Sequence, residues 1–487
     1  MMENTVQTSS DIDVKKTLTD MSADKEHGVA DTLSTEDEKR LVRKIDRHLM
    51  PLLIISYGLQ YLDKTSLSYS AILGIREDLN LKGQDFSWAS GIFYIGYLAA
   101  SYPISLGFVL ILTLHAVAED YPGLMVLRTF LGIFESAISP GFSLITGMWY
   151  TPKEHVSRHS FWFAGNSIAS LIGSGIAYGI LHYAGGFSKW MMLFITFGFV
   201  TVAWSIFLWF YLPDSPSNAR FLTPTEREFA SLRPKKFQHT TQTKQWDRGQ
   251  FIETFKDAKT WWFLLFSFVI CVPNGGTTSF NTIIINSFGY DEFQTILMGM
   301  PAAAFQLTTV ILTALFTTYI RKSRLAAMVV IFLMAIAGIL MVKLLPDSQK
   351  LSRLAGFWLF TAVAPAFPLM MSLFASNTAG FTKKSTVVAF IFVGYCVGNF
   401  VGPQFFNNAE APGYETAYTT ILTCFAISSG MAALLRVYLS WTNTKRDQEQ
   451  GVHIDPEETR EIDLQAGEGL DHVDETDIEN QSFRYII

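Results

Sequence analysis

The stretch Leu49–Ala71 constrains the fold more than any other part of this chain, because it is long enough to cross a ~30 Å hydrocarbon layer as a helix. It nevertheless carries two charged residues, Asp63 and Lys64, well past its midpoint from the basic end. A charge at that depth costs at least ~2.5 kcal/mol even on the more lenient insertion scale. Such residues usually line a protein interior or a water-filled cavity, so we predict that the rest of the chain encloses them.

Apolar blocks of about 20–30 residues alternate with short polar segments, which is typical of a protein with many membrane-spanning helices. Only 16% of the residues are charged and the mean hydropathy is +0.25, whereas a soluble domain carries about 25% charged residues. The three cysteines lie in apolar runs without ligand spacing, which predicts neither a disulfide framework nor a metal site. The sequence therefore predicts an all-α polytopic membrane protein that binds no cofactor and no nucleic acid.

Charge and composition divide the chain into five predicted regions. Basic residues crowd the start of the first span and the central polar stretch, and the positive-inside rule places both in the cytosol. Thr35 with Glu38, and Thr223 with Glu226, are helix-capping patterns that predict a helix start in each of these two segments. The predicted regions are a disordered tail over 1–37, a six-helix half over 38–213, a linker over 214–260, a second six-helix half over 261–441 and an acidic disordered tail over 442–487.

Residues 86–118 do not fit a regular pattern of spans. They contain no Asp, Glu, Lys or Arg, and a helix of that length would be roughly 50 Å long at ~1.5 Å per residue. Cytosolic loops on both sides require two crossings, yet each crossing would fall below the usual ~17–25 residues. Spans 2 and 3 are therefore shortened. Either the segment is a strained re-entrant hairpin or the chain has lost ~20 residues of a basic loop and its flanking helix ends, the interpretation we favour.

The arrangement of six spans, a linker and six spans resembles the major facilitator superfamily. Within it, four motifs resemble the anion:cation symporter group, and more narrowly its fungal allantoate permease branch: YLDKTSLSYS at 61–70, LRTFLGIFESAISPG at 127–141, MWYTPKEHVSRHS at 148–160 and AGNSIAS at 164–170. The resemblance implies a major facilitator fold and uptake of a small organic anion such as allantoate or nicotinate. The chain departs from the family in lacking the basic Gly/Asp/Arg loop between spans 2 and 3, which puts its activity in question.

Two further charged residues lie in the fourth predicted span. Arg128 and Glu135 are seven residues apart, which is two helical turns, so both lie on one face of the helix. A buried carboxylate near a cation can take up and release a proton as its surroundings change. A substrate carboxylate would compete for the same cation, which couples anion and proton. The resemblance assigns proton-coupling roles to Asp63 and Glu135 and substrate-side roles to Lys64 and Arg128.

Polar residues in other spans are weaker candidates for the transport path. Asn166, Asn281 and Asn399 are assigned to substrate binding, although amides in membrane helices also simply cross-link neighbours. Structural alternatives stand for the charged residues too: Asp63 and Lys64 as a neutralising pair, and Arg128 and Glu135 as a clamp between helices.

The predicted function is therefore secondary transport rather than catalysis. No P-loop or H-E-x-x-H motif occurs, so the chain is predicted to be neither a nucleotide-driven pump nor a zinc protease. We expect a monomeric symporter of a small organic anion and a proton, located in the plasma membrane with both termini in the cytosol. The alternatives are an exporter of a carboxylated secondary metabolite, or a transport-defective homologue or ligand sensor that reflects the missing loop.

Overall fold

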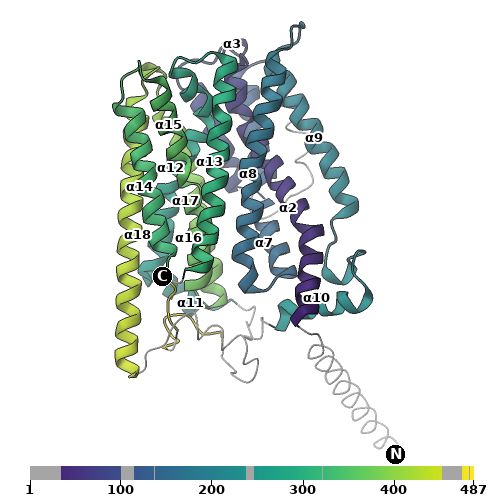
Figure 1. Ribbon diagram of the computed structural model, residues 1–487, viewed down its shortest axis with the longest axis vertical. Helices are drawn as coiled ribbons and strands as arrows, with labels where there is room; N and C mark the ends of the chain where they lie inside the picture. The colour runs from purple at the N-terminus through teal and green to yellow at the C-terminus, as the bar shows by residue number, and fades with distance from the viewer. Residues whose placement is uncertain are drawn as a thin grey trace, which may run out of the picture.

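The structure is a computed structural model that describes residues 35–99, 114–136, 138–236, 246–320, 322–451, 474–481 and 483–487. Regular secondary structure in these ranges is entirely helical, and the long helices stand side by side (Figure 1). Eight of the described helical segments are long and apolar enough to cross a membrane. The predicted all-α polytopic membrane architecture is confirmed.

In its described residues, the first half of the chain contains seven α-helices, of which α3 is short. The long first span, α2, carries Asp63 and Lys64 in its second half. The fourth predicted span corresponds to α6 and α7, and residue 137 between them lies outside the described residues. The bounds are α2 Thr35–Ile72, α3 Ile75–Asp78, α4 Asp85–Ala99, α6 Tyr121–Glu135, α7 Ile138–Trp149, α8 Pro152–Leu181 and α9 Lys189–Tyr211. The shortening predicted within 86–118 falls mainly on residues 100–113, which lie outside the described residues.

The second half matches the six spans expected from the apolar blocks. Its spans are α12 Ala258–Ser287, α13 Glu292–Tyr319, α14 Arg324–Leu344, α15 Lys350–Phe360 with α16 Ala366–Asn377, α17 Phe381–Val401 and α18 Glu415–Gln450. Two shorter helices precede them, α10 Pro224–Lys236 and α11 Arg248–Lys256. The capping pattern predicted for α10 is confirmed, because the Glu226 amide donates to Thr223 Oγ1 at 3.3 Å while the Thr223 amide donates to the Glu226 carboxylate at 2.8 Å.

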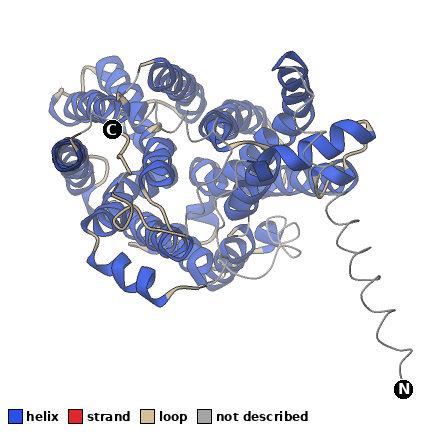
Figure 2. Ribbon diagram, turned by 90° about the horizontal axis from the view of Figure 1, so that it is seen from below, coloured by secondary structure: helices blue, strands red, loops and turns tan. Residues whose placement is uncertain are grey.

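The helices pair in the same order in both halves. The first span, α2, packs against α8, and α12 packs against α17 in the second half; likewise α4 packs against α6, and α13 against α15. Glycines allow the closest approach: a Cβ on Gly165 of α8 would lie 2.4 Å from the carbonyl oxygen of Ile54 in α2. The two halves meet through two helix pairs: α4 of the first half contacts α17 of the second, and α8 of the first contacts α13 of the second (Figure 2).

The helices end at two faces. We call the face that carries α10, α11 and the C-terminal residues 474–487 the terminal face, and the other, which carries α3, the opposite face (Figure 1). The sequence predicts a structureless tail from residue 442 onward. In the structure α18 continues to Gln450, and Asp477, Tyr485 and Ile486 are buried. Residues 474–481 and 483–487 contact residues far away in the sequence, and such contacts cannot be read from local composition.

Candidate functional site

A cavity lies between the two halves of the molecule. From the first half it is lined by Tyr57, Gln60, Tyr61 and Lys64 of α2, Tyr97 of α4, and Phe163 and Asn166 of α8. The second half contributes mainly α12 and the α15–α16 region, including Asn274, Asn281 and Phe367, with Tyr395 from α17. Its walls are thus aromatic rings and amides around one lysine.

Lys64 reaches this cavity from the first span. Its Nζ donates a hydrogen bond of 3.1 Å to the hydroxyl of Tyr395, and it lies 5.6, 5.3 and 5.8 Å from the ring centroids of Phe93, Tyr94 and Tyr395. Aromatic faces attract a cation without neutralising it. Within the described ranges, no carboxylate lies within 4.0 Å of Lys64. The lysine is therefore a cation held in place by rings and available to an anion in the cavity.

Asp63 points away from Lys64. Its side chain is fully buried and accepts a 3.3 Å hydrogen bond from the Thr201 hydroxyl of α9. Neighbouring helix positions diverge by about 100°, which places the two side chains in different surroundings. They do not form the neutralising pair that the structural alternative requires.

Arg128 and Glu135 lie inside the first half and outside the cavity lining. Both are buried, with exposures of 1% and 0%. Both carboxylate oxygens of Glu135, and Nε and Nη2 of Arg128, have no hydrogen-bond partner among the residues that the structure describes. A buried charge without a partner is costly, so a proton on Glu135 or an anion beside Arg128 would reduce that cost. The two residues do not form the ion-paired clamp of the structural alternative in the described part of the chain.

The four charged residues nevertheless form one electrostatic group. Glu135 interacts with Lys64 and Arg128, and Asp63 interacts with Glu135 and Arg128. The Glu135 main-chain carbonyl also accepts a 3.4 Å hydrogen bond from Gln60, which lines the cavity. A change of charge in the cavity would therefore be felt by both buried acids.

The three asparagines named from the sequence have different environments. Asn166 and Asn281 line the cavity, and the Oδ1 of each has no hydrogen-bond partner among the described residues. Asn399 is fully buried and does not line it. Its side chain instead accepts a 2.8 Å hydrogen bond from Asn274 and donates one of 2.8 Å to the Tyr395 carbonyl. Asn399 therefore positions two cavity residues, Asn274 and Tyr395. Neither is identified from the sequence; Tyr395, for example, is a tyrosine within an apolar run.

Hydrogen bonds join the two halves on the side of the opposite face. The Thr282 hydroxyl donates to the Ser68 carbonyl at 2.6 Å, Arg76 donates to Asn408 at 3.1 Å, and Gln404 donates to the Ser87 carbonyl at 3.2 Å. The seal of this conformation lies between the cavity and α3.

Comparisons with known proteins agree with this architecture. Residues 100–403 match the family model described as Major Facilitator Superfamily. An uncharacterized transporter of Schizosaccharomyces pombe is 34% identical over 477 residues, which cover 94% of this chain and 91% of that protein. The allantoate permease of Saccharomyces cerevisiae is 32% identical over 93% of this chain and 88% of its own length. In structure the chain is similar to the proton:xylose symporter XylE, with a TM-score of 0.61 and 13% identity over 80% of this chain and 94% of that one.

Proposed function

The chain belongs to the major facilitator superfamily, and from that premise we propose that it is a proton-coupled symporter of a small organic anion. Multi-pass membrane transport follows from the family and from the apolar helices. The anion, the proton and the direction are our proposal. One observation carries it: Lys64 faces the cavity between the halves with no carboxylate within ion-pair distance in the described ranges.

The cavity walls favour an anion with a flat or amide-bearing body. A single lysine would bind one carboxylate, and amide groups of Asn166, Asn274 and Asn281 surround the remaining space. Buried polar groups of this kind gain from a ligand that satisfies them and disfavour one that does not. The relative named allantoate permease supports allantoate as the first substrate to test.

Coupling would follow from the electrostatic group described above. When the anion binds at Lys64, the cation is shared and its effect on Glu135 weakens, so Glu135 gains affinity for a proton. The reverse also holds, because coupling free energies are reciprocal. We propose Arg128 as a second cation that draws the anion toward Glu135, and Asp63 as a proton carrier held by Thr201.

Uptake into cells that lack their own allantoate transport tests the proposal. We expect accumulation of labelled allantoate in acidic medium and its loss with a protonophore. Lower accumulation than in empty cells would instead favour an exporter. Ligand-induced thermal stabilisation without flux would favour a sensor, and either result would contradict symport.

We further propose that the terminal face lies in the cytosol and that the protein resides in the plasma membrane. The basic first helix and linker support this orientation. An epitope placed after Ile487 should be reached by antibody only in permeabilised cells. Staining of intact cells would contradict the orientation.

A further inference from the structure

At the terminal face, the helix ends of each half are in contact with a segment that follows the last span of that half. In the first half this segment is α10, which comes after α9; in the second half it is residues 474–487, the tail segment, which comes after α18. Each segment places one charged side chain between the bases of two packed spans. The two central residues, Arg233 and Asp477, have opposite charge.

In the first half the central residue is a cation between two acids. Arg233 of α10 contacts Glu38 near the start of α2 at 2.6 Å, and it forms a two-point ion pair with Glu154 near the start of α8, at 2.6 and 2.9 Å. Burial alone would raise the pKa of Glu154, but the hydrogen bonds and charge of Arg233 outweigh it and lower that pKa below its ordinary value. One guanidinium thus ties together the bases of two spans that pack against each other.

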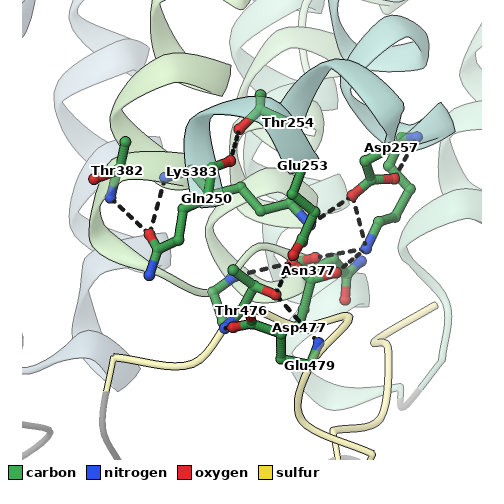
Figure 3. Close-up of polar contacts among 12 residues, drawn as sticks. Gln250, Glu253, Thr254, Asp257, Asn377, Thr382, Lys383, Thr476, Asp477 and Glu479 are labelled. Carbon is green, nitrogen blue, oxygen red and sulfur yellow. Dashed lines mark hydrogen bonds and ion pairs between the residues drawn. The ribbon is translucent and has the colours of Figure 1, made fainter. Parts of the chain in front are cut away.

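In the second half the central residue is an acid between two lysines. Asp477, itself fully buried, contacts Lys383 near the start of α17 at 3.0 Å, and it contacts Lys259 near the start of α12. Lys383 also pairs with Asp257 and Glu253, both at 2.8 Å. Figure 3 shows these residues gathered around Asp477. Burial alone would raise the pKa of Asp477, but the two lysines lower it below its ordinary value. Asp477 therefore has the same position in its half as Arg233, and its charge has the opposite sign.

The tail segment also completes the start of α17. The residue before that helix, Gly380, offers no side-chain cap, and the Phe381 amide donates instead to the Asp474 carboxylate at 3.0 Å. Nearby, the Asn377 side chain and the Ile486 main chain exchange two hydrogen bonds, of 2.8 and 2.7 Å. The segment therefore supplies the cap of α17 and adds a third acid, Asp477, to the two lysines that also pair with Asp257 and Glu253.

We propose that α10 and the tail segment each fasten the helices of their own half only, because the central charges of the two segments have opposite signs. We call these two segments the clasps. Arg233 placed beside Lys259 and Lys383 would meet two cations, although Asp257 and Glu253 lie there too, and Asp477 placed beside Glu38 and Glu154 would meet two acids. These like charges disfavour the exchange. Each clasp then moves together with its own half. Release of the tail segment weakens the contact between the starts of α12 and α17 and leaves the first half unchanged.

Two cysteine reporters in the full chain test this inference, in a background where the three native cysteines are replaced by serine. Ile486→Cys, the tail reporter, reports on the tail segment, and Ala230→Cys, the α10 reporter, reports on α10. Both positions are buried, and neither uses its side chain for a polar contact. The measurement is the rate of maleimide labelling in permeabilised membranes. We expect Asp477→Asn to speed labelling of the tail reporter roughly 10- to 100-fold, the range expected for loss of a charged hydrogen bond, and to leave the α10 reporter unchanged.

The matched variants decide whether the effect is specific. Glu475→Gln removes one charge from an exposed position two residues away and should leave both rates unchanged. Arg233→Met should expose the α10 reporter and leave the tail reporter protected. If Asp477→Asn does not give a monodisperse protein, Asp474→Ala, which removes the cap of α17 and the side-chain contact with Gln250, should still speed labelling of the tail reporter. Unchanged labelling of the tail reporter, or equal exposure of both reporters by either variant, would overturn the proposal.

Discussion

Lys64 is the residue on which anion binding depends in our proposal. Replacing it by methionine keeps much of the packing against the Tyr94 and Tyr395 rings but removes the charge. We expect the KM for the anion to rise roughly 10- to 100-fold, because a hydrogen bond to a charged group contributes ~1.5–3 kcal/mol. Initial rates of uptake over a range of substrate concentrations provide the measurement.

The control is Lys82→Met, which removes an exposed lysine at the opposite face and should leave KM unchanged. Lys64→Arg keeps the charge and adds a two-point donor, so it should retain uptake. An unaltered KM in Lys64→Met would show that the anion binds elsewhere.

Glu135 is the residue that we expect to link uptake to the proton gradient. Glu135→Gln preserves the shape of the side chain but fixes it in a neutral form. It should abolish accumulation driven by acidic medium while preserving exchange of labelled for unlabelled substrate, since exchange needs no net proton movement. Counterflow and pH-driven uptake are measured side by side, with the exposed Glu77→Gln as control. Full pH-driven accumulation by Glu135→Gln would remove Glu135 from the coupling role.

At this scale the sequence predicts part of the site. The charges of Asp63, Lys64 and Glu135 are conspicuous because they are costly inside a membrane. Tyr395 and Asn274 are not, since a tyrosine in an apolar run looks like core and an amide looks like a helix cross-link. Their roles depend on which helices meet at the centre, and that is a property of the assembled fold.

At the scale of helices, the contact between α2 and α8 depends on Gly165. A methyl group there would lie 2.4 Å from the Ile54 carbonyl oxygen, so Gly165→Ala must push the two helices apart. We expect a loss of about 1–3 kcal/mol, as for other overpacked sites, seen as a lower Tm of the detergent-solubilised protein. Gly179→Ala in the same helix meets nothing within 4 Å and should leave the Tm unchanged or slightly higher. Equal Tm values for the two variants would show that the helices can adjust.

The six spans of the second half are well predicted because each apolar block there ends at charged or polar residues. The tail segment is not predicted, because Asp477 is matched with Lys259, which lies 218 positions away in the chain. The acidic composition of the tail predicts disorder, because the lysines that pair with Asp477 lie far away in the sequence.

At the scale of the whole molecule, transport requires the halves to separate on the side of α3. Ser68 and Thr282 meet there, with side-chain oxygens 3.2 Å apart. We expect Ser68→Cys with Thr282→Cys, in a background without the native cysteines, to form a disulfide under oxidation and to stop uptake until a reductant is added. Mobility on non-reducing gels reports the bond, and each single variant serves as control. Cross-linked protein that transports at the unmodified rate would contradict motion at this seam.

The hydrogen bonds that join the halves on the α3 side affect the apparent affinity for a solute measured from each side of the membrane. The hydrogen bonds on the α3 side stabilise the conformation in which that side is closed, so we expect this conformation to predominate in the empty molecule. A solute that arrives from the α3 side must wait for a minority form, and every tenfold bias against that form weakens the measured affinity about tenfold. Inside-out and right-side-out vesicles should therefore report unequal half-saturation concentrations for the same compound.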